Sequence, residues 1–81
     1  MAMTHQELLD RITLTAEVCG GRPCIRGTRI EIAIILDALS EGLIPEQIMD
    51  HYPSLKTEDI RAAVACAAEL ARENVRKITA S

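Results

Sequence analysis

Glycine and proline interrupt the helical part of this 81-residue chain at two places. Gly42 suits the end of one helix, because the residue just past a helix often adopts the left-handed conformation. Pro45 suits the first turn of the next helix, and Tyr52-Pro53 ends it because a residue before proline avoids the α region. We therefore predict three helices within residues 31–78, arranged as a homeodomain-like helix-turn-helix core.

The apolar residues of this region repeat at helical spacing. Those of the first predicted helix lie on one face: Ile32, Ile35, Leu36 and Leu39. Those of the last form a stripe: Ile60, Val64, Ala67, Ala71, Val75 and Ile78. Thr57 is the expected N-cap of the last helix, whereas Ile44 is a poor N-cap for the short one, since it offers no side-chain oxygen. The shared core is expected to contain Ile48, Leu55, Ile60 and Val64.

Residues 1–30 have a different pattern, and we predict a short β-hairpin or arm there. Residues 6–12 could form a helical turn or two, and the following Ile12-Thr13-Leu14-Thr15 alternates in polarity as a short strand does. Cys19-Gly20-Gly21-Arg22-Pro23 is a predicted turn, and residues 24–30 continue as an extended stretch. No repeat or linker separates the arm from the helices, so the chain is predicted to be one mainly α domain.

The chain has no Trp or Phe, and Tyr52 is its only aromatic residue. A small core of aliphatic side chains stabilises a domain of this length only marginally, so we expect a homodimer. Ile34 and Ala38 form a second apolar stripe away from the predicted core face. They are the candidate dimer or partner contact, although a neighbouring arm could cover them equally well.

The arm concentrates basic residues, although the net charge of the whole chain is −3. Arg22, Arg26 and Arg29 lie within residues 18–30, a segment that contains no acidic residue. Together with Thr28 they are candidate contacts to DNA phosphates, and the nearby glycines allow close approach. The alternative is that Arg22 and Arg29 pair with acids and hold the arm in place. The candidate acids are Glu17, Glu31 and Asp37.

The start of the last helix adds two further candidate DNA contacts, Lys56 and Arg61. Glu58 and Asp59 suit the helix dipole there but would repel a phosphate backbone. From Glu41 onward the chain carries seven acidic and five basic residues. The arm is therefore the better candidate DNA contact, and a protein-interaction module that does not bind DNA stays open as an alternative.

Neither the cysteines nor the histidines form a recognisable catalytic or metal-binding pattern. Cys19, Cys24 and Cys66 lack the spacing of a zinc site, and His5 and His51 have no nucleophile beside them. We predict no enzymatic activity, no metal and no cofactor, with a Cys19–Cys24 redox pair left as an alternative. The odd cysteine count and the lack of a signal-peptide pattern predict a cytoplasmic protein. No apolar stretch approaches the ~20 residues that would cross a membrane.

Residues 18–30, with the segment Arg26-Gly27-Thr28-Arg29, resemble the signature of the family called domain of unknown function 433. The resemblance covers residues 10–72 and includes three further segments: Pro45-Glu46-Gln47-Ile48, Tyr52-Pro53-Ser54-Leu55 and Thr57-Glu58-Asp59-Ile60. It implies a helix-turn-helix-like antitoxin domain of a bacterial toxin–antitoxin pair. Such a protein would neutralise a toxin resembling PIN-domain ribonucleases and bind operator DNA as a dimer. A stand-alone interaction module, or a DNA-binding regulator without a toxin partner, is the alternative.

Overall fold

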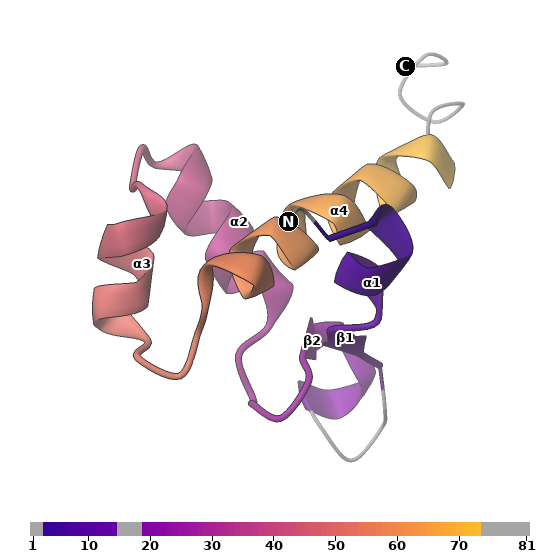
Figure 1. The fold of residues 1–81 in the computed structure, drawn as a ribbon, viewed down its shortest axis with the longest axis horizontal. Helices are drawn as coiled ribbons and strands as arrows, with labels where there is room; N and C mark the ends of the chain where they lie inside the picture. Colours follow the sequence, from indigo (N-terminus) through magenta and orange to yellow (C-terminus); the bar gives the residue numbers. More distant parts are fainter. Residues whose placement is uncertain (1–2, 15–18, 74–81) are drawn as a thin grey trace.

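The computed structural model describes residues 3–14 and 19–73, which form a mainly helical fold with a small β-sheet. The elements in order are α1 (His5–Leu9), β1 (Ile12–Thr13), the 3₁₀ helix η1 (Cys19–Gly21), β2 (Cys24–Ile25), α2 (Ile32–Ser40), α3 (Pro45–His51) and α4 (Thr57–Glu73). α4 crosses the fold, with α1 on one side and α2 and α3 on the other (Figure 1). The predicted mainly α class, with three helices after a β element, is confirmed.

The chain begins with a short helix, which agrees with the helical turn predicted within residues 6–12, so residues 1–30 are not a β arm throughout. Thr4 caps α1: its hydroxyl accepts a hydrogen bond from the Glu7 N–H at 3.1 Å, and its own N–H donates to Glu7 Oε1 at 2.8 Å. This reciprocal pair stabilises the first turn of a helix that would otherwise be too short to persist. Leu8 is buried against two alanines of α4, Ala62 and Ala65. The arm therefore docks on the helical core through a helix.

The sheet places Cys24 and Ile25 between two partners. Ile12 pairs with Ile25, and Thr13 with Cys24, in antiparallel register. On the other side Cys24 forms an antiparallel bridge with Glu31, and the Ile25 N–H donates to the Ile30 carbonyl at 3.0 Å. Residues 26–29 are consequently the tip of a second hairpin. The predicted strand ran to Thr15, which lies outside the described residues.

The core is aliphatic, as the composition predicts. Its buried residues come from β2, α2, α3, α4 and the α3–α4 connection: Ile25, Ile32, Ile35, Ile48, Leu55, Ile60 and Ala63. Val64, however, is 49% exposed, so its predicted place in the core is wrong. α4 is covered by α1 as well as α2, and the buried face is therefore centred on Ala62 and Ala63, to one side of the predicted stripe. The positions of that stripe at Val75 and Ile78 lie outside the described residues.

α2 ends and α3 begins where Gly42 and Pro45 predict. Gly42 has φ +97°, its N–H donates to the Leu39 carbonyl at 3.1 Å, and the Leu43 N–H donates to the Ala38 carbonyl at 3.1 Å. These two bonds are the Schellman arrangement that ends a helix with glycine at C′. α3 begins at Pro45 as predicted, and Ile44 contributes no side-chain cap.

The predicted N-cap of α4 is wrong by one residue. Thr57 is already helical, and the Lys56 carbonyl accepts the Asp59 N–H at 2.9 Å. Asp59 Oδ2 in turn accepts a hydrogen bond from the Lys56 N–H at 2.9 Å. The carboxylate at the third helical position thus satisfies the amide at the helix entrance, as it does in a capping box. The side chain that stabilises this end of α4 is therefore Asp59, not Thr57.

Candidate functional site

The segment Arg26-Gly27-Thr28-Arg29 forms a tight turn, which we call the hairpin tip. The Thr28 N–H donates to the Ile25 carbonyl at 3.0 Å, and Gly27 has φ +83° as the third residue of a type II turn requires. The Thr28 hydroxyl donates to the same carbonyl at 2.8 Å and accepts the Ile30 N–H at 3.0 Å. Thr28 was a predicted phosphate contact, but its side chain holds the turn together.

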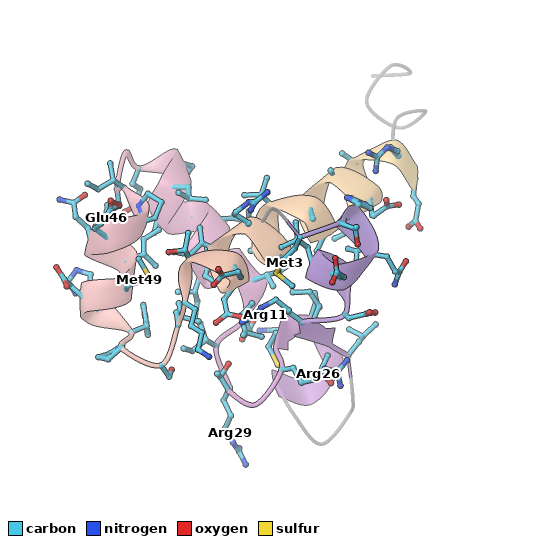
Figure 2. The ribbon with its side chains drawn as sticks, viewed as in Figure 1. Met3, Arg11, Arg26, Arg29, Glu46 and Met49 are labelled. Atoms are coloured by element: carbon cyan, nitrogen blue, oxygen red, sulfur yellow. The ribbon has the colours of Figure 1, made fainter. Side chains whose placement is uncertain are left out.

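The hairpin tip borders a surface pocket of about 470 Å³, the tip pocket. Its lining consists of Thr13 and the four tip residues Arg26, Gly27, Thr28 and Arg29. Both arginines are exposed, and Arg29 extends outward from the tip, away from the helices (Figure 2). Two guanidinium groups at one concave surface form a site of positive charge that favours an anionic ligand such as a phosphate.

Arg26 also has a structural role. Its Nε donates to the Asp10 carbonyl at 2.9 Å and its Nη2 to the Ile12 carbonyl at 3.1 Å. Its backbone N–H donates to the Arg11 carbonyl at 2.8 Å. Arg26 therefore ties the hairpin tip to the junction between α1 and β1, and this fixes the direction in which the tip projects.

The remaining candidate cations lie elsewhere. Arg22 Nη1 is 3.6 Å from Glu31 Oε1, so the predicted pairing of an arm arginine with Glu31 is found for this residue, although its side chain stays 74% exposed. Lys56 is exposed at the entrance of α4. Arg61 is exposed on the next turn of α4 and lines a second, apolar pocket. The structure thus brings Arg26, Thr28 and Arg29 together but leaves Arg61 on a different surface.

An ion pair that the sequence did not indicate joins the arm to α4. Arg11 Nε donates to Asp59 Oδ1 at 2.9 Å, and Asp59 is 5% exposed. The prediction that Asp59 is an exposed acid that would repel DNA is wrong, because its carboxylate accepts hydrogen bonds from Arg11 and from the Lys56 amide. The negative charge exposed in the first turn of α4 is correspondingly smaller. No local pattern could reveal a pair whose members are 48 positions apart.

Residues 12–67 match the family described as Protein of unknown function (DUF433), which is more than half of the chain. This chain belongs to the DUF433 family. The match contains β1, the hairpin tip, α2, α3 and the first part of α4.

Two further comparisons extend this result. The crystal structure of a DUF433 member protein from Anabaena variabilis has a TM-score of 0.72 and 31% identity, and the alignment covers 91% of this chain and 73% of that one. The "Uncharacterized protein y4eO" of Sinorhizobium fredii is 33% identical over 52 residues, which are 64% of this chain and 24% of that protein. The chain therefore spans about a quarter of the length of this curated relative.

The two residues of the predicted dimer contact of this DUF433 chain, Ile34 and Ala38, differ in their exposure to solvent. Ile34 is 39% exposed, in agreement with its predicted place off the core face. Ala38 is half-buried and packs against the core, so its assignment to the outer stripe is wrong. The Leu43 N–H bonds to the Ala38 carbonyl, and the chain turns back over this end of α2.

The cysteines and histidines are dispersed over the described part of this DUF433 chain. Within it no three His, Cys, Asp or Glu side chains are grouped as a metal site would require. Cys24 is buried with Sγ 3.8 Å from the Thr28 carbonyl oxygen, and burial raises the pKa of the half-buried Cys66 thiol. His5 Nε2 lies 2.6 Å from Glu69 Oε1 and links α1 to α4. The side chain of Cys19 lies outside what the structure describes.

Among the described residues, no helix has the length and apolar character needed to cross a membrane.

Proposed function

We propose that this DUF433 chain is a non-enzymatic macromolecule-binding protein, the antitoxin of a toxin–antitoxin pair. It binds a PIN-like ribonuclease toxin and, as a homodimer, contacts operator DNA through the hairpin tip. The observation that carries the DNA contact is the pair of exposed guanidinium groups, Arg26 and Arg29, at the tip pocket. The partner class is the one that the family resemblance implies.

The rigidity of the hairpin tip supports a phosphate contact. Thr28 closes the turn with three hydrogen bonds, and Arg26 fastens it to two carbonyl groups of the preceding segment. A preorganised loop loses little conformational entropy when it binds, so each charge contributes more of its interaction to affinity. Phosphate contacts of this kind position a protein on DNA without reading sequence.

A dimer would present two such tips. Cores without aromatic residues stabilise small domains weakly, and Ile34 on α2 leaves an aliphatic side chain exposed. Two copies related by a two-fold axis place equivalent contacts at two half-sites, as dimeric DNA-binding proteins do. Lys56, exposed at the entrance of α4, is a further candidate DNA contact, whereas Arg61 lies on a different surface.

The DNA contact is tested by binding to a duplex that carries the region upstream of the protein's own gene. Fluorescence anisotropy is measured from about 50 to about 200 mM salt. Arg29→Ala should weaken binding and lower the slope of log affinity against log salt by about 1 for each protomer in contact. Arg72→Ala removes the same charge from the far end of α4 and should leave the slope unchanged. Equal slopes for both variants and the wild type would remove the tip from the interface.

The toxin contact is tested separately, by coexpression with the product of the adjacent gene. A stoichiometric complex whose ribonuclease activity is suppressed supports the antitoxin function. A stable protein that forms no complex with that product favours the stand-alone module, which the net charge of −3 also suits.

A further inference from the structure

A second concave surface lies where all four α-helices approach one another. This α1–α4 groove has a volume of about 410 Å³. Its lining contains one residue of α1, one of α2, one of α3 and four of α4: Leu8, Leu39, Pro45, Ile60, Arg61, Val64 and Ala65. Six of these seven residues are apolar. The groove therefore differs in character from the tip pocket, which contains two arginines.

The groove exposes apolar surface to water, chiefly through the side chain of Val64. It is a branched aliphatic residue in the middle of α4, and yet it is 49% exposed. Ile44, which directly precedes Pro45 of the groove, is 54% exposed. Exposed aliphatic side chains at a concave surface are characteristic of a contact site for another molecule.

Arg61 is the only charged residue in the lining of the groove. Within the part of the chain that the structure describes, its guanidinium makes no hydrogen bond or ion pair. Arg11 and Arg72, by contrast, are paired with Asp59 and Glu69 at 2.9 Å. An arginine at the edge of an apolar groove is suited to a carboxylate, because its planar fork can hold both oxygens while the groove takes the adjacent apolar side chain.

We infer that the α1–α4 groove docks a segment of a protein partner in which a large apolar side chain stands beside an Asp or Glu. The inference rests on the protein-binding half of the proposed function and gives it a surface. A phosphate backbone would gain nothing from the six apolar lining residues. A whole second copy is a poor fit, because a stable dimer interface uses ~20–30 residues a side and the groove offers seven. A short segment with one apolar anchor and one acid matches the size and the charge.

The experiment uses the full chain and a random short-peptide library displayed on phage. The library is selected in parallel against the wild type, Arg61→Glu and the control Arg72→Glu. Wild type and Arg72→Glu should enrich peptides with a large apolar residue next to an acid. Arg61→Glu should bind those peptides about tenfold or more weakly and enrich peptides with Lys or Arg in place of the acid. Enriched sequences that are the same for all three proteins overturn the inference, as does the absence of enrichment.

Mapping of the bound peptide identifies the surface. In ¹⁵N-labelled wild type, the selected acidic peptide should shift the amide signals of Leu8, Leu39 and Val64 and leave those of the hairpin tip in place. Val64→Glu, a change at a half-exposed position, should abolish these shifts while the far-ultraviolet spectrum and melting curve stay those of a folded protein. Shifts confined to another surface overturn the inference.

Two controls separate this inference from the proposed function. If the adjacent gene product forms no complex but the charge-dependent peptide binding is found, the antitoxin function fails and the groove inference stands. If the complex forms and Val64→Glu and Arg61→Glu leave it intact, the antitoxin function stands and the groove is not its docking site. A dimer that Val64→Glu dissociates in sedimentation would show a second copy in the groove and overturn the inference.

Discussion

The hairpin tip and the α1–α4 groove differ in how the chain builds them. The tip is held by polar contacts: Thr28 and Arg26 both donate hydrogen bonds to backbone carbonyls. The groove is held by packing, since Leu8 and Ile60 are buried at its base while Val64 stays exposed. One surface presents charge on a rigid turn, and the other presents apolar area beside one charge. Two chemically different surfaces suit two different classes of partner.

The two surfaces are joined by Asp59. Its carboxylate accepts from Arg11, which precedes β1, and from the amide of Lys56 at the entrance of α4. Arg11 also accepts, through its carbonyl, the backbone N–H of Arg26. The buried Asp59 carboxylate therefore helps to orient the hairpin tip on α4, beside the docking of α1, whereas the groove depends on helix packing. This difference can be tested by substitutions that affect one surface and not the other.

The largest effect is expected from Asp59→Ala. The substitution leaves Arg11 without its carboxylate and the Lys56 amide without its acceptor, and together these should cost about 2–3 kcal/mol of the free energy of unfolding. Urea denaturation measures the loss. Glu58→Ala, the neighbouring acid, should change the free energy of unfolding by less than about 0.5 kcal/mol. If the two variants are equally stable, Asp59 does not hold the arm on α4.

A smaller effect is expected from Arg26→Ala, which should lower both stability and DNA affinity. Loss of the bonds to the Asp10 and Ile12 carbonyls should cost about 1 kcal/mol of unfolding free energy. Arg29→Ala, at the outward and exposed end of the same tip, should weaken DNA binding and cost less unfolding free energy than Arg26→Ala. Peptide binding in the α1–α4 groove should be unchanged in both. A stability loss of the same size in Arg29→Ala would contradict the division of roles within the tip.

The parts of the fold that were predictable are those with local signals. Gly42 and Pro45 identify the end of α2 and the start of α3, because a left-handed residue and a fixed φ act on their own backbone. The concentration of arginines in residues 22–29 likewise points to the exposed hairpin tip. Local signals of this kind depend on a few adjacent residues and do not need the tertiary structure.

The parts that were not predictable depend on contacts between distant segments. The stripe through Ile60 and Val64 has the right period, but the side of α4 that faces the core is decided by α1, and α1 was not expected to dock there. The role of Asp59 depends on Arg11, and the role of Arg26 on carbonyl groups of residues 10–12. Arg61 was predicted to contact DNA together with the tip arginines, because the charge of a residue does not show on which surface of the fold it lies.

The smallest effect concerns α1, which supplies Leu8 to the groove and bears on the tip only through the chain that follows it. The hydrogen bond from the Thr4 backbone lowers the pKa of Glu7 below its ordinary value. A carboxyl whose pKa is lower in the folded state stabilises the fold at pH above its unfolded pKa, and this contribution is lost as the pH falls through the folded pKa. Glu7→Gln keeps an acceptor for the Thr4 amide but cannot titrate.

The difference in unfolding free energy between wild type and Glu7→Gln should therefore be larger at about pH 7 than at about pH 3. Urea denaturation at the two pH values measures it. Leu8 belongs to α1, so at about pH 7 Glu7→Gln should also bind the groove peptide slightly less well than the wild type, whereas the tip should be unaffected. A difference that does not change with pH would mean that Glu7 does not act as an ionised cap. In that case the Thr4 hydroxyl would cap α1 without help from the Glu7 charge, and the burial of Leu8 and the His5–Glu69 contact would hold α1 on α4.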